Sequence, residues 1–124
     1  MIFAYVCLQY RALTPEALQA NKRAAREIAK RINAIPGWRA VVPHNLSEGI
    51  ESSLTEDEWL EFDIELMKRS CDVLVWHVEL SNSDGCMKER RRFEGAKVCE
   101  SELEEVAAEI AARQVRRALH RGRC

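Results

Sequence analysis

The sequence lacks several features that mark common protein classes. Its five cysteines form no Cys-x-x-Cys pair and no Cys/His ligand spacing, so neither a metal site nor a disulfide framework is indicated. A phosphate-binding P-loop and an ordered Ser/His/Asp set are also missing. No apolar run approaches the roughly 20 residues of a membrane span, and the chain does not open with a signal-peptide pattern. These absences predict a cytoplasmic protein that needs no metal or other cofactor.

An excess of charge of one sign is missing too. The 19 basic and 20 acidic residues give a formal net charge of -1, which argues against a general nucleic-acid binder but not against a small anionic ligand. The three prolines and five glycines form no linker, and no segment is repeated. We therefore expect the 124 residues to form one domain over positions 1–124.

What the sequence does contain is an alternation of apolar runs and amphipathic segments. The runs at 2–8, 38–42 and 72–78 are typical of strands buried on both faces, and the segments at 15–35, 56–71 and 101–120 show helical periodicity. Residues 95–99 fit either a brief fourth strand or a continued helix. Strand–helix–strand units of these lengths predict parallel strands joined by right-handed crossovers. The expected fold is a small doubly wound, Rossmann-like α/β sandwich of about four parallel strands with helices on both faces.

Reactive side chains follow the third apolar run. Ser83 or Asp84 can cap a new helix there, and in that helix Cys86, Glu89 and Phe93 share one face. Glu89 is thus directed toward apolar neighbours, and the helix dipole favours its ionised form. An ionised, partly enclosed carboxylate at the end of a buried strand can act as a nucleophile or anchor a ligand. The alternative is an ordinary first-turn glutamate paired with a nearby arginine.

A second carboxylate falls on an apolar helical face. The expected stripe of the helix at 56–71 is built from Trp59, Leu60, Leu66 and Met67, and Asp63 lies within it. Burying an unpaired carboxylate costs several kcal/mol. Asp63 is therefore expected either to make a structural hydrogen bond or to reach a cleft, whereas Asp72 is more typical of a turn. Residues 46–54 could form a flap over a pocket or only a connection.

Three segments, in this order, resemble the nucleoside 2-deoxyribosyltransferase-like superfamily, and in particular its small, uncharacterised phage and bacterial branch. The first is Tyr5 followed by Gln9-Tyr10-Arg11, the second is Trp59-Leu60-Glu61-Phe62-Asp63 leading to Cys71-Asp72, and the third is Ser83-Asp84-Gly85 followed by Glu89. The likeness covers residues 1 to about 98.

The resemblance implies an enzyme that cleaves or exchanges the N-glycosidic bond of a deoxynucleoside or its 5′-monophosphate. It implies that Glu89 is the nucleophile that forms a glycosyl-enzyme, that Asp63 contacts or protonates the departing base, and that Tyr5 orients the nucleophile. It also implies substrate-binding roles for Tyr10, Arg11, His44, Ser83, Asp84 and Gly85. Members of the superfamily pair so that a neighbour closes the pocket, so a homodimer or higher homo-oligomer is expected.

Departures from the family pattern support a different function. The branch has Gly-Pro where this chain has Leu8 and Gln9, and glycine where it has Ala12, so a ligand could not approach that backbone as closely. The spacing from Asp63 to Asp72 is also longer than usual. The alternative is therefore a non-catalytic module that binds or senses a nucleotide, and a third possibility is a protein that assembles through its last helix.

Overall fold

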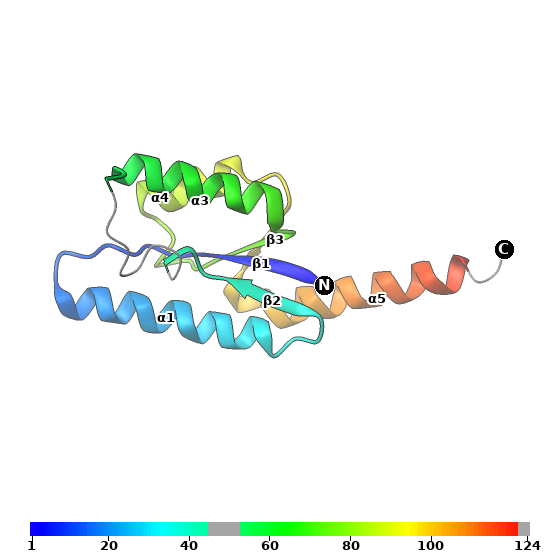
Figure 1. The fold of residues 1–124 in the computed structure, drawn as a ribbon. Coiled ribbons are helices and arrows are strands. Elements are labelled where there is room, and N and C mark those ends of the chain that lie inside the picture. The colour runs from blue at the N-terminus through cyan, green and yellow to red at the C-terminus, as the bar shows by residue number, and fades with distance from the viewer. Residues whose placement is uncertain (45–52, 122–124) are drawn as a thin grey trace.

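The computed structural model describes residues 1–44 and 53–121, in which strands and helices alternate. In order along the chain these elements are β1 (Ile2–Cys7), α1 (Pro15–Asn33), β2 (Trp38–Val41), α3 (Glu56–Ser70), β3 (Val73–Trp76), α4 (Asp84–Arg92), β4 (Ala96–Cys99), η1 (Glu100–Glu102) and α5 (Leu103–Arg121). The strands form one parallel sheet in the order β2-β1-β3-β4. Helices α1 and α5 cover one face, and α3 and α4 cover the other (Figure 1). The predicted doubly wound α/β fold is confirmed, and residues 95–99 contribute a strand.

Local capping explains where the helices begin. The side chain of Thr14, directly before Pro15, accepts a hydrogen bond from the Ala17 amide, and Thr55 and Glu58 form a capping box. Ser83, not Asp84, caps α4 by accepting from the Cys86 amide at 3.2 Å. These hydrogen bonds satisfy amide groups that have no partner inside the helix, and so they fix where α1, α3 and α4 begin.

The sheet separates two apolar clusters. Because successive side chains of a strand point to opposite faces, Ala4 and Val6 of β1 pack toward α1 and α5, whereas Tyr5 and Cys7 pack toward α3 and α4. The buried side of α3 is centred on Ile64 and Met67, with Leu60 and Cys71 partly buried beside them. Of the predicted stripe, Met67 and Leu60 are confirmed, whereas Trp59 and Leu66 are half-buried and lie outside this cluster. Ile64 takes their place, and Asp63 next to it is half-buried.

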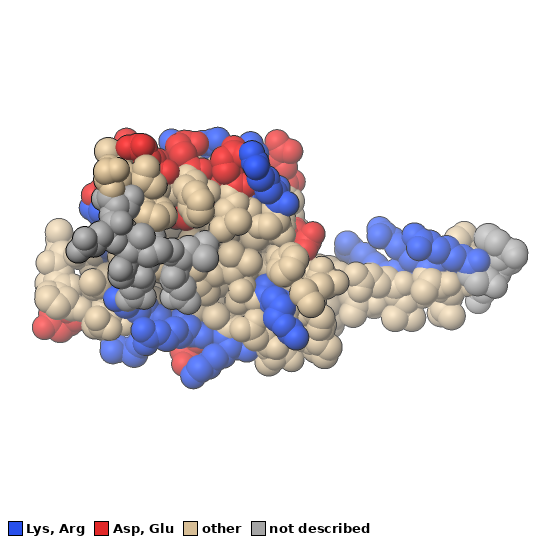
Figure 2. Space-filling model, viewed as in Figure 1, with Lys and Arg blue, Asp and Glu red and all other residues tan. Residues whose placement is uncertain are grey.

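The last helix packs over only its first half. Leu103 and Ala107 are buried, but Val115 and Leu119 are about 60% exposed on the part of α5 that extends beyond the sheet (Figure 1). Basic side chains gather along that outer part and over α1, and acidic ones gather over α3 and α4 (Figure 2). Within the described residues, no helix combines the length and the apolar character needed to cross a membrane.

Candidate functional site

A cleft of about 750 Å³ opens at the carboxyl edge of the sheet. It is bordered by the segments that follow β1 and β2, by the first turns of α3 and by the start of α4. Open parallel sheets bind their ligands at this edge. The cleft is lined by every predicted site residue except Tyr5, namely Tyr10, Arg11, His44, Asp63, Ser83, Asp84, Gly85 and Glu89.

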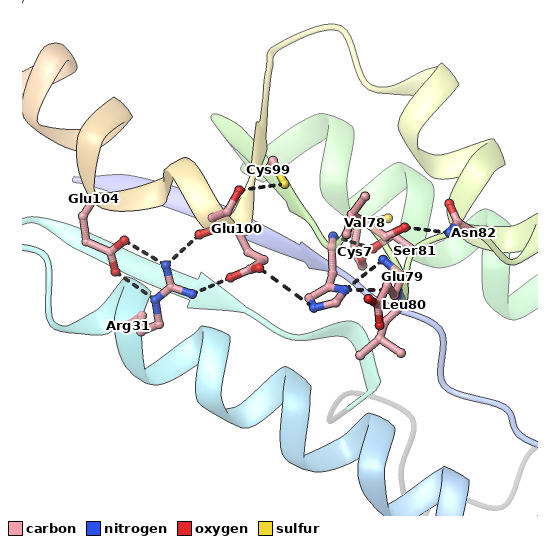
Figure 3. Close-up of polar contacts among 12 residues, drawn as sticks. Cys7, Arg31, Val78, Glu79, Leu80, Ser81, Asn82, Cys99, Glu100 and Glu104 are labelled. Carbon is pink, nitrogen blue, oxygen red and sulfur yellow. Dashed lines mark hydrogen bonds and ion pairs between the residues drawn. The ribbon is translucent and has the colours of Figure 1, made fainter.

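Two loops are joined beneath this cleft. The Ser81 hydroxyl donates to the carbonyl of Cys7 at the end of β1 and accepts from the His77 amide at 2.8 Å, and the Gln9 amide donates to the Leu80 carbonyl at 2.8 Å. Figure 3 shows Ser81 and Cys7 facing each other in this arrangement. The segments that follow β1 and β3 are thereby held together, and residues farther along both segments line the cleft.

Glu89 is buried at the bottom of the cleft, with 6% of its surface exposed. The phenol of Tyr5 donates a hydrogen bond to Glu89 Oε2, and the Cys7 thiol lies 3.8 Å from Oε1. Burial raises the pKa of Tyr5, so its phenol stays protonated and acts as the donor. The prediction that Cys86, Glu89 and Phe93 share a buried face is confirmed.

The arginines beside Glu89 make other contacts. The guanidinium of Arg92 pairs with Glu61 at 2.8 Å, and that of Arg90 stacks 4.3 Å from the Trp76 ring centroid. Among the described residues, the side-chain hydrogen-bond partners of Glu89 are Tyr5 and Cys7, and no arginine forms an ion pair with it. The alternative of a first-turn glutamate paired with an arginine is therefore wrong.

The charge state of Glu89 differs from the expectation. Burial raises the pKa of its carboxyl to about 8, although the hydrogen bond from Tyr5 lowers it in part. Glu89 is the sixth residue of α4, and the helix dipole acts mainly within the first turn. The effect of desolvation on the pKa of Glu89 therefore outweighs that of the helix dipole, and a carboxyl with this pKa is mostly protonated at pH 7.

Asp63 supplies a second carboxyl group to the same cleft. Its Oδ1 is buried and has no hydrogen-bond partner within the described residues, and desolvation raises its pKa to about 6. Ionised Asp63 also raises the pKa of Glu89, so the two groups are electrostatically coupled. Asp72, in contrast, accepts from the Phe3 amide at 2.9 Å and is structural, as predicted.

The loop at the start of α4 contains the helix cap Ser83 and leaves space beside Gly85. The Ser83 hydroxyl is engaged with the Cys86 amide, and Asp84 is exposed. Among the residues that the structure describes, a Cβ added at Gly85 would meet only Leu60, at an ordinary contact distance of 3.8 Å. Because the fold itself tolerates a side chain there, the room that glycine leaves is available to a ligand in the cleft.

The other predicted binding residues form the opposite rim. Arg11 makes an ion pair with Glu56, which offsets the charge expected to assist an anion. The Nε2 atom of His44 lies 2.7 Å from the Leu8 carbonyl oxygen, and its ring centroid is 4.9 Å from that of Tyr10. Most of the predicted flap or connection at 46–54, namely positions 46–52, lies outside the described residues.

Two cysteines near Glu89 were not recognised as site residues from the sequence. The spacing of the cysteines in the sequence indicated no metal site, yet the sulfurs of Cys7 and Cys86 and a Glu89 oxygen all lie within 4.8 Å of one another. The available signals were weak. The two-residue period of β1 puts Cys7 on the Tyr5 face, and the helical spacing of three puts Cys86 beside Glu89.

Comparisons of the chain with protein-family models, with curated proteins and with solved structures find no match. The resemblance to the nucleoside 2-deoxyribosyltransferase-like superfamily therefore stays a prediction. A function for this protein has to be built on the side chains that meet in the cleft.

Proposed function

We propose that the protein cleaves the N-glycosidic bond of a deoxynucleoside or a deoxynucleoside 5′-monophosphate, with Glu89 as the nucleophile. The observation that carries the proposal is the hydrogen bond from Tyr5 to buried Glu89, in a cleft that Asp63 also lines. The cleft volume of about 750 Å³ lies within the range of roughly 300–1,000 Å³ that is usual for small-molecule sites.

In the proposed reaction, the Glu89 carboxylate attacks the anomeric carbon of the sugar. A carbon–oxygen ester bond forms as the carbon–nitrogen bond breaks, and the departing base takes the bonding electron pair and a proton from Asp63. Water, or a second base, then attacks the same carbon, gives its proton to Asp63 and releases Glu89. Hydrolysis and transfer differ only in this second acceptor.

In this reaction, one of the two carboxyl groups must be ionised and the other must be protonated. With pKa values of about 8 for Glu89 and about 6 for Asp63, both raised by burial, the pair keeps a single proton near pH 7. The reaction requires the charge on Glu89 and the proton on Asp63. The hydrogen bond from Tyr5 favours this distribution, because a phenol donor stabilises the carboxylate that accepts from it.

One observation favours a second function, a module that binds a nucleoside or nucleotide without cleaving it. The higher of the two pKa values belongs to Glu89, the group that must be ionised for attack. A protonated Glu89 would instead donate a hydrogen bond to a ligand. The substitution of family glycines by Leu8 and Ala12 in the first loop agrees with such a binding role.

Both functions can be tested with the purified protein and each deoxynucleoside and 5′-monophosphate. Free base would be followed by chromatography for wild type, for Glu89→Gln, and for the control Glu94→Gln, which alters an exposed glutamate just beyond α4. Release by wild type and control but not by Glu89→Gln, with a glycosyl adduct on the Glu89 peptide after acid quenching, is expected. Binding without release supports the sensing module, and the absence of both overturns the two functions together.

A further inference from the structure

Glu89 shares its buried position with two thiols. Cys7 on β1 is fully buried and Cys86 on α4 is 3% exposed, and the ligand atoms of the three residues lie within 4.8 Å of one another. The Cys7 sulfur is 3.8 Å from Glu89 Oε1 and 3.6 Å from the Cys86 carbonyl oxygen. The fold thus assembles a compact set of two sulfurs and one carboxylate oxygen from distant parts of the chain.

We propose that Cys7, Cys86 and Glu89 form a binding site for a thiophilic divalent cation such as Zn²⁺. In tetrahedral zinc sites, the metal–sulfur distance is about 2.3 Å and the metal–oxygen distance about 2.0–2.2 Å, which places ligand atoms roughly 3.5–3.8 Å apart. The contact between Cys7 and Glu89 already has this length. The remaining separations, which are 4.8 Å at most, need to shorten by up to about 1.3 Å, within the reach of a side-chain adjustment.

The surroundings suit this ligand set. The hydrogen bond between the two thiols lowers the pKa of Cys86, whereas the same hydrogen bond and burial raise the pKa of Cys7, an effect that the positive charge of Arg90 opposes. A cation that binds here must therefore displace the proton of the Cys7 thiol. Tyr5 holds Glu89 Oε2, which leaves Oε1 toward Cys7, as an outer hydrogen-bond partner orients a metal ligand. Cys86 and Glu89 both line the cleft, so an ion can enter there and complete its coordination with water.

A bound cation would change the proposed chemistry of the cleft. It would hold the carboxylate of Glu89, so that this group could no longer attack a sugar, and base release would be inhibited. This consequence rests on the proposed function. The binding itself does not, because it depends only on the three ligands.

The binding test uses the reduced full-length protein titrated with Cd²⁺, whose thiolate-to-metal charge-transfer band appears in the ultraviolet. The triple variant Cys71→Ser/Cys99→Ser/Cys124→Ser keeps only the two proposed ligand thiols and is expected to retain the band with one equivalent of metal. Adding Cys86→Ser to it should abolish the band. Tyr5→Phe, which removes the outer partner, should weaken binding by about 10–100-fold.

Absence of the band in the reduced wild-type protein would overturn the proposal, as would a band that survives Cys86→Ser. Circular dichroism checks that each variant is folded, and Glu89→Gln, which keeps both thiols, is expected to bind Cd²⁺ at least tenfold more weakly. Unchanged affinity in Glu89→Gln would remove the carboxylate from the site. If no base is released under any condition, the charge-transfer band still decides the question of metal binding.

Discussion

The two faces of the sheet carry different kinds of side chain. The face toward α1 and α5 is packed by aliphatic side chains and Trp38, whereas the face toward α3 and α4 places Tyr5, Cys7 and Cys86 beside Glu89. A single strand, β1, supplies both faces through its alternation. One side of this strand therefore contributes apolar burial, and the other presents groups that can donate protons, bind ligands or react.

Burial has opposite energetic effects on the two faces. Removing apolar surface from water stabilises the cluster around α1 and α5. On the other face, burial raises the pKa values of Glu89 and Asp63, so ionising either group costs free energy in the folded protein. A carboxyl that destabilises the fold at neutral pH is typical of a functional site.

The largest effect is expected from a cavity on the face of the sheet toward α1 and α5. Ile32→Ala empties a fully buried position on α1 and should lower the free energy of unfolding by about 3–4 kcal/mol, within the range for large-to-small core substitutions. Urea unfolding measures the loss. The activity of the folded fraction should not change, because Ile32 lies across the sheet from the cleft. Val115→Ala, at an exposed position on α5, serves as the control and should cost under about 0.5 kcal/mol.

On the opposite face, Tyr5→Phe should slow the proposed reaction. It removes the donor to Glu89 Oε2 and leaves a buried acceptor without that partner, at a cost of about 1–3 kcal/mol. The rate of base release should therefore fall by about 10–100-fold, as measured by chromatography at substrate concentrations below saturation. An unchanged rate in a folded Tyr5→Phe protein would mean that the phenol does not support the carboxylate that we propose as the nucleophile.

Asp63→Asn should stabilise the protein at neutral pH. The pKa of Asp63 is raised from 3.8 to about 6, so its protonated form favours the folded state below about pH 4, and that stabilisation is lost as the pH rises through 6. Asparagine avoids this loss. Allowing for partial solvent exposure, we expect a gain of about 1–2 kcal/mol at pH 7 that vanishes by pH 4.

Urea unfolding between pH 4 and pH 7 would measure this gain. The control is Asp57→Asn, at an exposed position near the start of the same helix, where no stabilisation is expected. A gain for Asp63→Asn of the same size at every pH would show that its carboxyl is not the destabilising group.

Features that depend on neighbouring residues could be predicted from the sequence, whereas features that depend on distant parts of the chain could not. The caps Thr14, Thr55 and Ser83 and the buried face of α4 were predictable, because they depend on residues within one or two helical turns. The strand Ala96–Cys99 was ambiguous because it lies at the edge of the sheet and only Val98 is buried. Alternation is too short a signal over four residues to separate a strand from a helix.

The properties of the candidate site depend on distances that no local pattern records. The raised pKa of Glu89 reflects how deeply α4 packs against the sheet, and the thiol cluster joins Cys7 to Cys86, 79 residues away. The sequence placed Glu89 near a helix start and so predicted an ionised group. Only its burial shows that desolvation outweighs the dipole.

The smallest expected effect concerns an ion pair between the helices that cover the other face of the sheet. Arg31 on α1 donates to Glu100 at 2.6 Å and to Glu104 at 2.8 Å, and so links α1 to η1 and α5 (Figure 3). Arg31→Gln should cost under about 1 kcal/mol, because its partners are partly exposed, and the cost should shrink as salt is added. The control Arg69→Gln breaks a more exposed pair with Glu65 within α3 and should cost less still. Equal losses in urea unfolding would mean that apolar packing alone holds α1 against α5, and would sharpen the contrast with the face toward α3 and α4, where the polar groups of Tyr5 and Glu89 pack within the apolar cluster.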